Sequence, residues 1–316
     1  MSLRSMAGIL FICAVIGVPW LVSDWLPEAN QESGAGNNPF VPGLGEDRRK
    51  KRQFSEIRIR RPRPVNSSSK RAASKGVVKS VATGARALTG RPQRGIVPES
   101  KVSLAAAARH STRISREMNG LGLRLGDPVF CRIFKEENEL ELWVQPEGRQ
   151  EFSLFRVYRI CKRSGGPGPK TREGDRQAPE GFYFVTPGRM VAETRYHLGF
   201  DIGYPNLLDH SRGRTGDDVL VHGKCVSNSS FALTDGAIEE VFTIAAAALK
   251  NGQPFFRVHC FPFRMDDKRM DPQIGKYPAY DTFWANLKEG YDFFEILRFP
   301  PNVTAGSDGT YTFSVK

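Results

Sequence analysis

The sequence predicts a mainly β domain with appended helices, preceded by a hydrophobic leader and a long basic linker. Apolar residues alternate in several short segments after residue 128, and two longer segments have helical spacing. Most of the net positive charge lies before residue 102. A length of 316 residues could accommodate two domains, but this uneven composition favours one domain and a tail.

Residues 1–26 are predicted to be a signal peptide or a signal anchor. Ala7–Val22 is an unbroken apolar run that follows the basic residue Arg4. This run is at the short end for a membrane span, and no clear cleavage site follows it, so both forms stay open. Because no Lys or Arg lies between Ser23 and Asp47, we expect the rest of the chain to be exported. The expected location is periplasmic, either membrane-anchored or secreted across the inner membrane.

Residues 27–110 are predicted to be a disordered basic linker. Glu46–Lys101 contains 17 Lys or Arg against 4 Asp or Glu, a net charge of +13, whereas the whole chain carries +12. The rest is close to neutral, which argues against a nucleic-acid-binding domain. The linker could contact anionic lipid or an acidic wall polymer, or it could be a solvated spacer.

Strands are expected throughout the folded part. The alternating or apolar segments are Val129–Lys135, Leu140–Gln145, Phe152–Ile160, Gly181–Thr186, Arg195–Asp201, Val219–His222 and Phe255–Phe263. The polar turn Glu136–Glu139 joins the first two strands. Ser164–Gln177, rich in Gly and Pro, is long enough to be a binding loop.

Two helices complete the predicted domain. The first begins at the capping residue Asp235, runs to about Leu249 and is closed by Asn251-Gly252. The second, Asp281–Arg298, has large apolar residues at helical spacing. These elements predict a main domain over residues 119–265 and a C-terminal helical extension over residues 266–316 packed on it.

The segment from Val221 to Asp235 carries the most informative motif. It begins with His222-Gly223 and continues through Ser227 to Ser229-Ser230. This pattern resembles the active-site signature of the YkuD-type L,D-transpeptidases, His-Gly followed by Ser-x-Gly-Cys, in the short-spaced form of the YafK branch. Ser229 and Ser230 stand where that signature has glycine and the nucleophilic cysteine.

Further blocks in the same order extend the resemblance over roughly residues 121–265. They are Arg132–Glu137 with Leu140–Leu142, Gly168–Lys170, Glu173–Asp175, Ala178–Tyr183, Arg195–Leu198, Gly213–Gly216 and Phe256–His259. The resemblance implies a mostly β, sandwich-like YkuD fold.

The resemblance also implies a chemistry. In this family a cysteine thiolate attacks the meso-diaminopimelate carbonyl of a peptidoglycan stem peptide, and the acyl-enzyme passes to an amine or to water. The YafK branch is associated with cutting links between lipoprotein and peptidoglycan. His222 matches the base, the Gly223 carbonyl would orient its ring, and the amides near Ser229 and Ser230 would form the oxyanion hole. No cofactor is implied, and no cluster of residues has zinc spacing.

The two serines leave several interpretations open. The domain could bind stem peptides with impaired or absent catalysis, since a hydroxyl does not pre-ionise as a thiol does. Alternatively, Ser230 could act as nucleophile with His222, or Cys225 could take that part. A non-catalytic envelope tether is the third class.

Other residues are candidates for substrate binding or for disulfides. The expected substrate-binding residues are Ser227, Ser229, His197, Arg214 and Thr215, with the arginine suited to a substrate carboxylate. Four cysteines follow the leader and allow three pairings, which the sequence leaves open: Cys131, Cys161, Cys225 and Cys260. Cys131 and Cys260 are expected to be buried apolar residues, and His259 to be structural.

Overall fold

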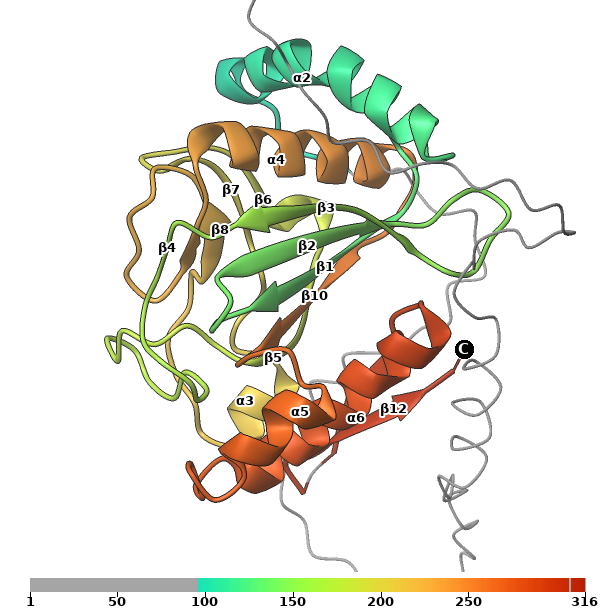
Figure 1. Cartoon of the computed structure of the whole chain (residues 1–316). Helices are drawn as coiled ribbons and strands as arrows, with labels where there is room; N and C mark the ends of the chain where they lie inside the picture. Colours follow the sequence, from blue (N-terminus) through green and yellow to red (C-terminus); the bar gives the residue numbers. More distant parts are fainter. Residues whose placement is uncertain (1–95, 307, 316) are drawn as a thin grey trace, which may run out of the picture. The chain divides into compact units, whose positions relative to one another are not determined.

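The computed structural model describes residues 96–306 and 308–315. The predicted leader and the linker up to residue 95 lie outside this range. The described chain is a mixed α/β domain with two five-stranded sheets and a two-stranded hairpin. The predicted combination of strands and helices is confirmed, but the prediction of a mainly β fold underestimated the share of helix, because long helices cover the sheets (Figure 1).

We call the two large sheets sheet A and sheet B. Sheet A has the spatial order β3 (Ser153–Arg159), β2 (Glu139–Val144), β1 (Val129–Phe134), β10 (Phe256–Phe261) and β5 (Gly181–Val185). Sheet B has the order β4 (Lys162–Arg163), β9 (Phe231–Ala232), β8 (Leu220–His222), β7 (His197–Asp201) and β6 (Met190–Thr194). The pairs β1–β10 and β8–β9 are parallel, and the other pairs are antiparallel.

Helix α4 (Asp235–Lys250) packs on β7 and β8, and α2 (Lys101–Gly120) lies along its outer side (Figure 1). Because α4 is covered on both sides, apolar residues occur around most of its circumference. Its N-cap is Thr234, whose hydroxyl accepts from Ala237 N at 3.3 Å, so the predicted cap Asp235 is instead the first helical residue.

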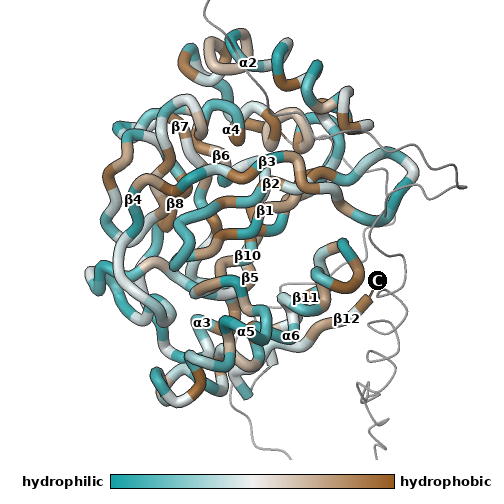
Figure 2. The backbone as a smooth tube through the Cα atoms, in the orientation of Figure 1, coloured by the Kyte–Doolittle hydropathy of each residue, from teal (hydrophilic) through white to brown (hydrophobic). Residues whose placement is uncertain are grey.

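Helix α2 corrects the predicted linker, which was expected to continue to residue 110. Ser100 caps α2 by accepting hydrogen bonds from Val102 N and Ser103 N, each at 3.1 Å. Four consecutive alanines, 105–108, have the highest helix propensity. Hydrophobic and hydrophilic stretches alternate along the helix, whose buried face includes Ile114 and Met118 (Figure 2). The linker prediction rested on the basic composition of the segment and therefore missed this amphipathic helix.

One face of sheet A faces α4, and the C-terminal extension packs on the opposite face. Helix α6 (Asp281–Leu297) buries the apolar side chains that predicted it, among them Trp284 and Leu287, against Phe134 and Phe261 of the sheet. The extension also contains α5 (Asp267–Met270) and a hairpin of β11 (Asn302–Ala305) and β12 (Tyr311–Ser314). It is therefore not wholly helical.

The predicted strands agree with the observed ones to within two residues at most ends. The main differences are in sheet B, where β4, β6 and β9 were missed and β7 begins at His197 rather than Arg195. Strands β4 and β9 have two residues each, too few for an alternating pattern, and β6 begins with three consecutive apolar residues, Met190–Ala192, that do not alternate. Helix α3 (Leu207–Ser211) is also short. Within the described residues, no helix is long and apolar enough to span a membrane.

Candidate active site

His222 ends β8 and is held in one orientation. Its Nδ1 donates to the carbonyl oxygen of Gly223 at 2.7 Å, and its ring stacks on Tyr196 with centroids 4.6 Å apart. The side chain is 2% exposed, and burial lowers the pKa of the imidazole despite the opposing bond to Gly223. Because Nδ1 carries the proton in this arrangement, the neutral ring has an unprotonated Nε2 available as a base.

Gly223 occupies a position that leaves no room for a side chain. A Cβ atom there would lie 2.6 Å from the Asp235 carboxylate and 3.0 Å from the Tyr196 carbonyl oxygen. The Gly223 amide donates to Tyr196 O and Leu198 O of the neighbouring hairpin. Glycine is needed here for this close approach of the loop to β7.

The loop that follows is closed by a disulfide between Cys161 and Cys225. This pairing settles one of the three possibilities that the sequence left open, and it contradicts the interpretation of Cys225 as a free nucleophile. Cys131 and Cys260 are free thiols buried in the core, as predicted. Burial raises the pKa of both thiols, which makes them poor nucleophiles.

A chain of hydroxyl groups fixes the end of the motif. Ser229 N donates to Ser164 Oγ at 2.9 Å, and Ser164 Oγ lies 3.1 Å from Ser227 Oγ. Ser227 Oγ in turn donates to Ser230 O at 2.6 Å and accepts from Ser230 N at 3.2 Å. The two amides expected to form an oxyanion hole are therefore already engaged by serine hydroxyls.

Ser230 is buried beside β8 and faces a backbone group. It is 7% exposed, and its Oγ accepts from Leu220 N at 3.3 Å. The register of the parallel pair places His222 opposite Ala232, two residues beyond Ser230. Within the described chain, no hydrogen bond joins Ser230 to His222.

Ser229 lies in the left-handed region with φ of 81°, as do Lys224 at 64° and Cys225 at 46°. Such angles are unfavourable for residues with a side chain and suit glycine. The Ser229 side chain therefore keeps backbone strain in this loop.

The other predicted substrate-binding residues make structural contacts. His197 Nε2 lies 2.7 Å from Glu239 Oε1, which draws its ring toward α4. Arg214 Nη1 donates to the buried Asp209 carboxylate at 2.7 Å, so its charge is already neutralised. Thr215 Oγ1 accepts from Glu173 N at 3.2 Å and ties its own turn to the Gly/Pro-rich loop.

A buried ion pair between Lys135 and Glu180 anchors the Gly/Pro-rich loop Ser164–Gln177. Lys135 Nζ donates to Glu180 Oε1 at 2.9 Å and to the carbonyl oxygens of Gly168 and Ala178. Trp284 of α6 donates to the second Glu180 oxygen at 2.8 Å. The extension thus helps to position the loop beside the motif.

Sequence reasoning did not single out Ser164, Tyr196 or Lys135 as parts of the site. Tyr196 and Lys135 lie within blocks of the family resemblance, which was the available signal. Ser164 lies at the start of the predicted binding loop, but its contact with Ser227 spans 63 residues and depends on tertiary structure. Among the described residues, no group of three or more His, Cys, Asp or Glu is arranged to hold a metal ion.

No family model matches the chain. Over 211 residues it is 40% identical to the "Putative L,D-transpeptidase YafK" of Escherichia coli strain K12, a match covering 67% of this chain and 83% of that protein. The protein of the same name from Escherichia coli O157:H7 matches to the same extent.

Two solved structures show weaker similarity. The helical cell shape determining protein Pgp2 from Campylobacter jejuni is 18% identical, with a TM-score of 0.35 over 58% of this chain and 67% of that chain. Bd1075 from Bdellovibrio bacteriovorus is 18% identical, with a TM-score of 0.30 over 54% of this chain and 62% of that chain. On the identity and coverage of its sequence match, the chain belongs to the YafK-type L,D-transpeptidase family.

Proposed function

We propose that this protein recognises peptidoglycan stem peptides in the cell envelope and that its L,D-transpeptidase or amidase chemistry is impaired or absent. Family membership supports the substrate class. The observation that carries the second part is the state of Ser230, whose hydroxyl contacts Leu220 N and has no bond to His222.

The chemistry of oxygen and sulfur explains why this substitution matters. A thiol with an ordinary pKa of about 8.5 is readily converted to a thiolate beside an imidazole or a helix N-terminus. A hydroxyl stays protonated until attack, so it needs a base aligned with its proton and oxyanion donors aimed at the reacting carbonyl. Here the base has no bond to the hydroxyl, and the amides of Ser229 and Ser230 already donate to other serines.

The ordered Gly/Pro-rich loop Ser164–Gln177 supports the proposed peptide binding. The Ser164–Gln177 loop is braced by Lys135, and within it Lys170 Nζ donates to Asp175 Oδ1 at 2.7 Å. Burial acts to raise the pKa of Asp175, but its hydrogen bonds from Lys170 and three backbone amides outweigh this and lower it. An ordered polar loop of this kind supports recognition without requiring turnover.

A second candidate function is catalysis by Ser230 with His222. The unprotonated Nε2 of a buried, neutral imidazole favours this candidate, because such a nitrogen can accept a hydroxyl proton. Catalysis by Ser230 would require its hydroxyl to turn away from Leu220 N. The Ser230 amide would also have to give up its hydrogen bond to Ser227 Oγ and donate to the substrate instead.

The two candidates differ in a direct assay. Purified full chain is incubated with tetrapeptide muropeptides, binding is measured by calorimetry, and D-alanine release is followed chromatographically. Binding with no release above that of Ser230→Ala supports the proposal. Robust release abolished by Ser230→Ala would establish the serine enzyme instead, and a lack of binding would remove the stem peptide as ligand.

The disulfide favours a location outside the cytoplasm, because structural disulfides persist in oxidising compartments. A reporter that is active only outside the cytoplasm, fused after Lys316, should therefore be active. Activity of a cytoplasm-only reporter at that position would contradict an exported domain.

A further inference from the structure

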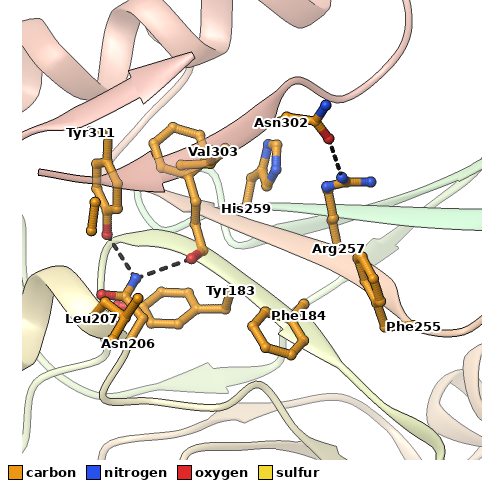
Figure 3. A pocket seen from close by; sticks show the side chains of 12 residues that line it. Tyr183, Phe184, Asn206, Leu207, Phe255, Arg257, His259, Asn302, Val303 and Tyr311 are labelled. Carbon is orange, nitrogen blue, oxygen red and sulfur yellow. Dashed lines mark hydrogen bonds between the residues drawn. The ribbon is translucent and has the colours of Figure 1, made fainter. Parts of the chain in front are cut away.

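A pocket of about 280 Å³ opens on the face of sheet A that carries the C-terminal extension (Figure 3). Its walls come from β5, β10, the start of α3 and the hairpin β11–β12. None of its lining residues belongs to the motif of residues 222–230, so it is a separate feature of the molecule.

Aromatic and apolar side chains make most of the wall. Phe184 of the edge strand β5 is 47% exposed, and its ring lies 5.5 Å from that of Phe255. Leu207 at the opposite rim is 74% exposed. A pocket with such walls favours an apolar body on its ligand.

Arg257 supplies an uncompensated positive charge to this pocket. Its guanidinium lies 5.2 Å from the centroid of the Phe255 ring and donates from Nη2 to the neutral amide oxygen of Asn302 at 2.9 Å. No carboxylate in the described chain pairs with it, and burial lowers its pKa. The guanidinium has five N–H donors, so donors remain for a second acceptor.

Two other arginines that lie over aromatic rings, Arg132 and Arg264, have carboxylate partners. Arg132 pairs with Glu141 and Glu295, and Arg264 with Glu141 as well. Burying a charge without a counter-ion is costly, which is why such groups are normally paired. Among the described residues Arg257 has no such partner, and it lines a pocket that is open to solvent.

His259 lines the same pocket and is also short of a partner. Its side chain is 1% exposed, and neither ring nitrogen forms a hydrogen bond to any of the described residues. The rings of Phe130 and Phe182 lie 4.6 Å and 4.7 Å away. Burial, with Arg257 and Arg132 nearby, holds its pKa well below the usual value, so the ring is neutral. Its N–H is a donor without an acceptor.

We propose that this pocket binds a carboxylate carried on a short apolar or aromatic body, with Arg257 as its counter-ion. The ring or alkyl part would lie between Phe184 and Leu207, and the carboxylate would face the guanidinium. A carboxylate satisfies an arginine with two parallel hydrogen bonds, which a neutral amide does not reproduce. The volume lies just below the range of about 300–1,000 Å³ for drug-sized ligands, so the bound group is small. It is either a free acid or the C-terminal residue of a peptide.

Calorimetry with matched probes tests this site in the purified full chain. The first pair is 3-phenylpropionate and 3-phenylpropionamide, and the second is acetyl-Gly-Gly-Phe with a free or an amidated C-terminus. We expect the acid of at least one pair to bind ten times or more tightly than its amide. Binding of 3-phenylpropionate without binding of the peptide acid would indicate a small metabolite as ligand. Tighter binding of acetyl-Gly-Gly-Phe with a free C-terminus would indicate the C-terminal residue of a peptide.

Variants separate the pocket from the catalytic motif. Arg257→Met should abolish the preference for acid, Arg257→Lys should retain part of it, and Phe184→Ser should weaken acid and amide together. His222→Ala should change none of these affinities, because His222 is not among the lining residues. If Arg257→Met fails to fold by circular dichroism, Arg257→Gln and Phe184→Ser carry the test. Equal binding of acid and amide, a preference that survives loss of the guanidinium, or no binding at millimolar concentration would each overturn the proposal.

Discussion

Ser229 combines a φ of 81° with a side chain. Glycine adopts this conformation without steric cost, so Ser229→Gly should raise the free energy of unfolding by about 0.5–1 kcal/mol. Urea denaturation measures this change.

Ser227 provides the matched control, because its hydroxyl bonds both the amide and the carbonyl of Ser230. Ser227→Gly should destabilise the protein by about 1 kcal/mol or more. Equal effects of the two substitutions would mean that the strain at Ser229 is relieved in solution.

Replacing Ser230 by cysteine should restore a reactive thiol at the motif. The double change Ser229→Gly with Ser230→Cys leaves His222 in place and should create a reactive thiol that a carbapenem acylates, seen as a mass shift of the intact protein. The wild type and the Ser229→Gly single variant should stay unlabelled. A folded double variant without label would show that the site around His222 has changed at more positions than the two serines.

Among the elements, the disulfide between the start of β4 and the motif loop has the largest expected effect. It closes a loop of 64 residues, and removing such a crosslink costs about 2–4 kcal/mol. We expect Cys161→Ala with Cys225→Ala to lower stability by this amount and to increase amide hydrogen exchange in residues 223–230. A reducing agent should destabilise the wild type and leave the double variant unaffected; an equal loss in both would place the effect elsewhere.

Helix α2 is attached to α4 by a cluster of charges around Glu239. This carboxylate accepts from Arg109, His110 and His197, and although burial acts to raise its pKa, these hydrogen bonds lower it to about 2. Glu239→Gln should therefore cost about 1.5–3 kcal/mol at neutral pH, the range for hydrogen bonds to charged groups.

The control for α2 is Glu117→Gln, which removes a more exposed carboxylate of the same helix pair and should destabilise the protein less than Glu239→Gln does. Thermal unfolding compares the two variants. Because the pKa of Glu239 is lowered, its contribution is present above pH 4.5 and is lost as the pH falls toward 2, so the gap between the variants should close in acid.

The elements also show how far sequence reasoning reaches. Strands β1, β2, β5 and β10 and helices α4 and α6 were predicted because each is long or strongly apolar. Helix α2 was missed because Lys101–Gly120 continues a basic, low-complexity composition, and its amphipathic face is narrow. At the site, the motif identified His222 and Gly223, whereas the partners of Arg214 and His197 depend on contacts between distant segments.

For the whole molecule, buried imidazoles predict lower stability in mild acid. His259 and His222 both have a pKa below the ordinary 6.5, so the unfolded chain binds protons that the folded chain does not. Stability should be fully present above pH 6.5 and should decline as the pH falls below it. His259→Leu, which removes an unpartnered buried imidazole, should reduce the fall in melting temperature between pH 7.5 and pH 5. An unchanged fall would exclude His259 as the main source.

The parallel pairing of β1 with β10 delays the completion of sheet A while the chain is being synthesised. Gln253 bonds both the N–H and the C=O of Val129 across 124 residues, and β1 takes its second neighbour from the far end of the domain. Closing such distant contacts is slow, because loop entropy must be lost before packing energy is gained. Sheet A cannot be completed until residue 261 has been synthesised. The centre of sheet A is therefore among the last parts of the domain to form, because β1 stays without one of its two neighbours until β10 has been made.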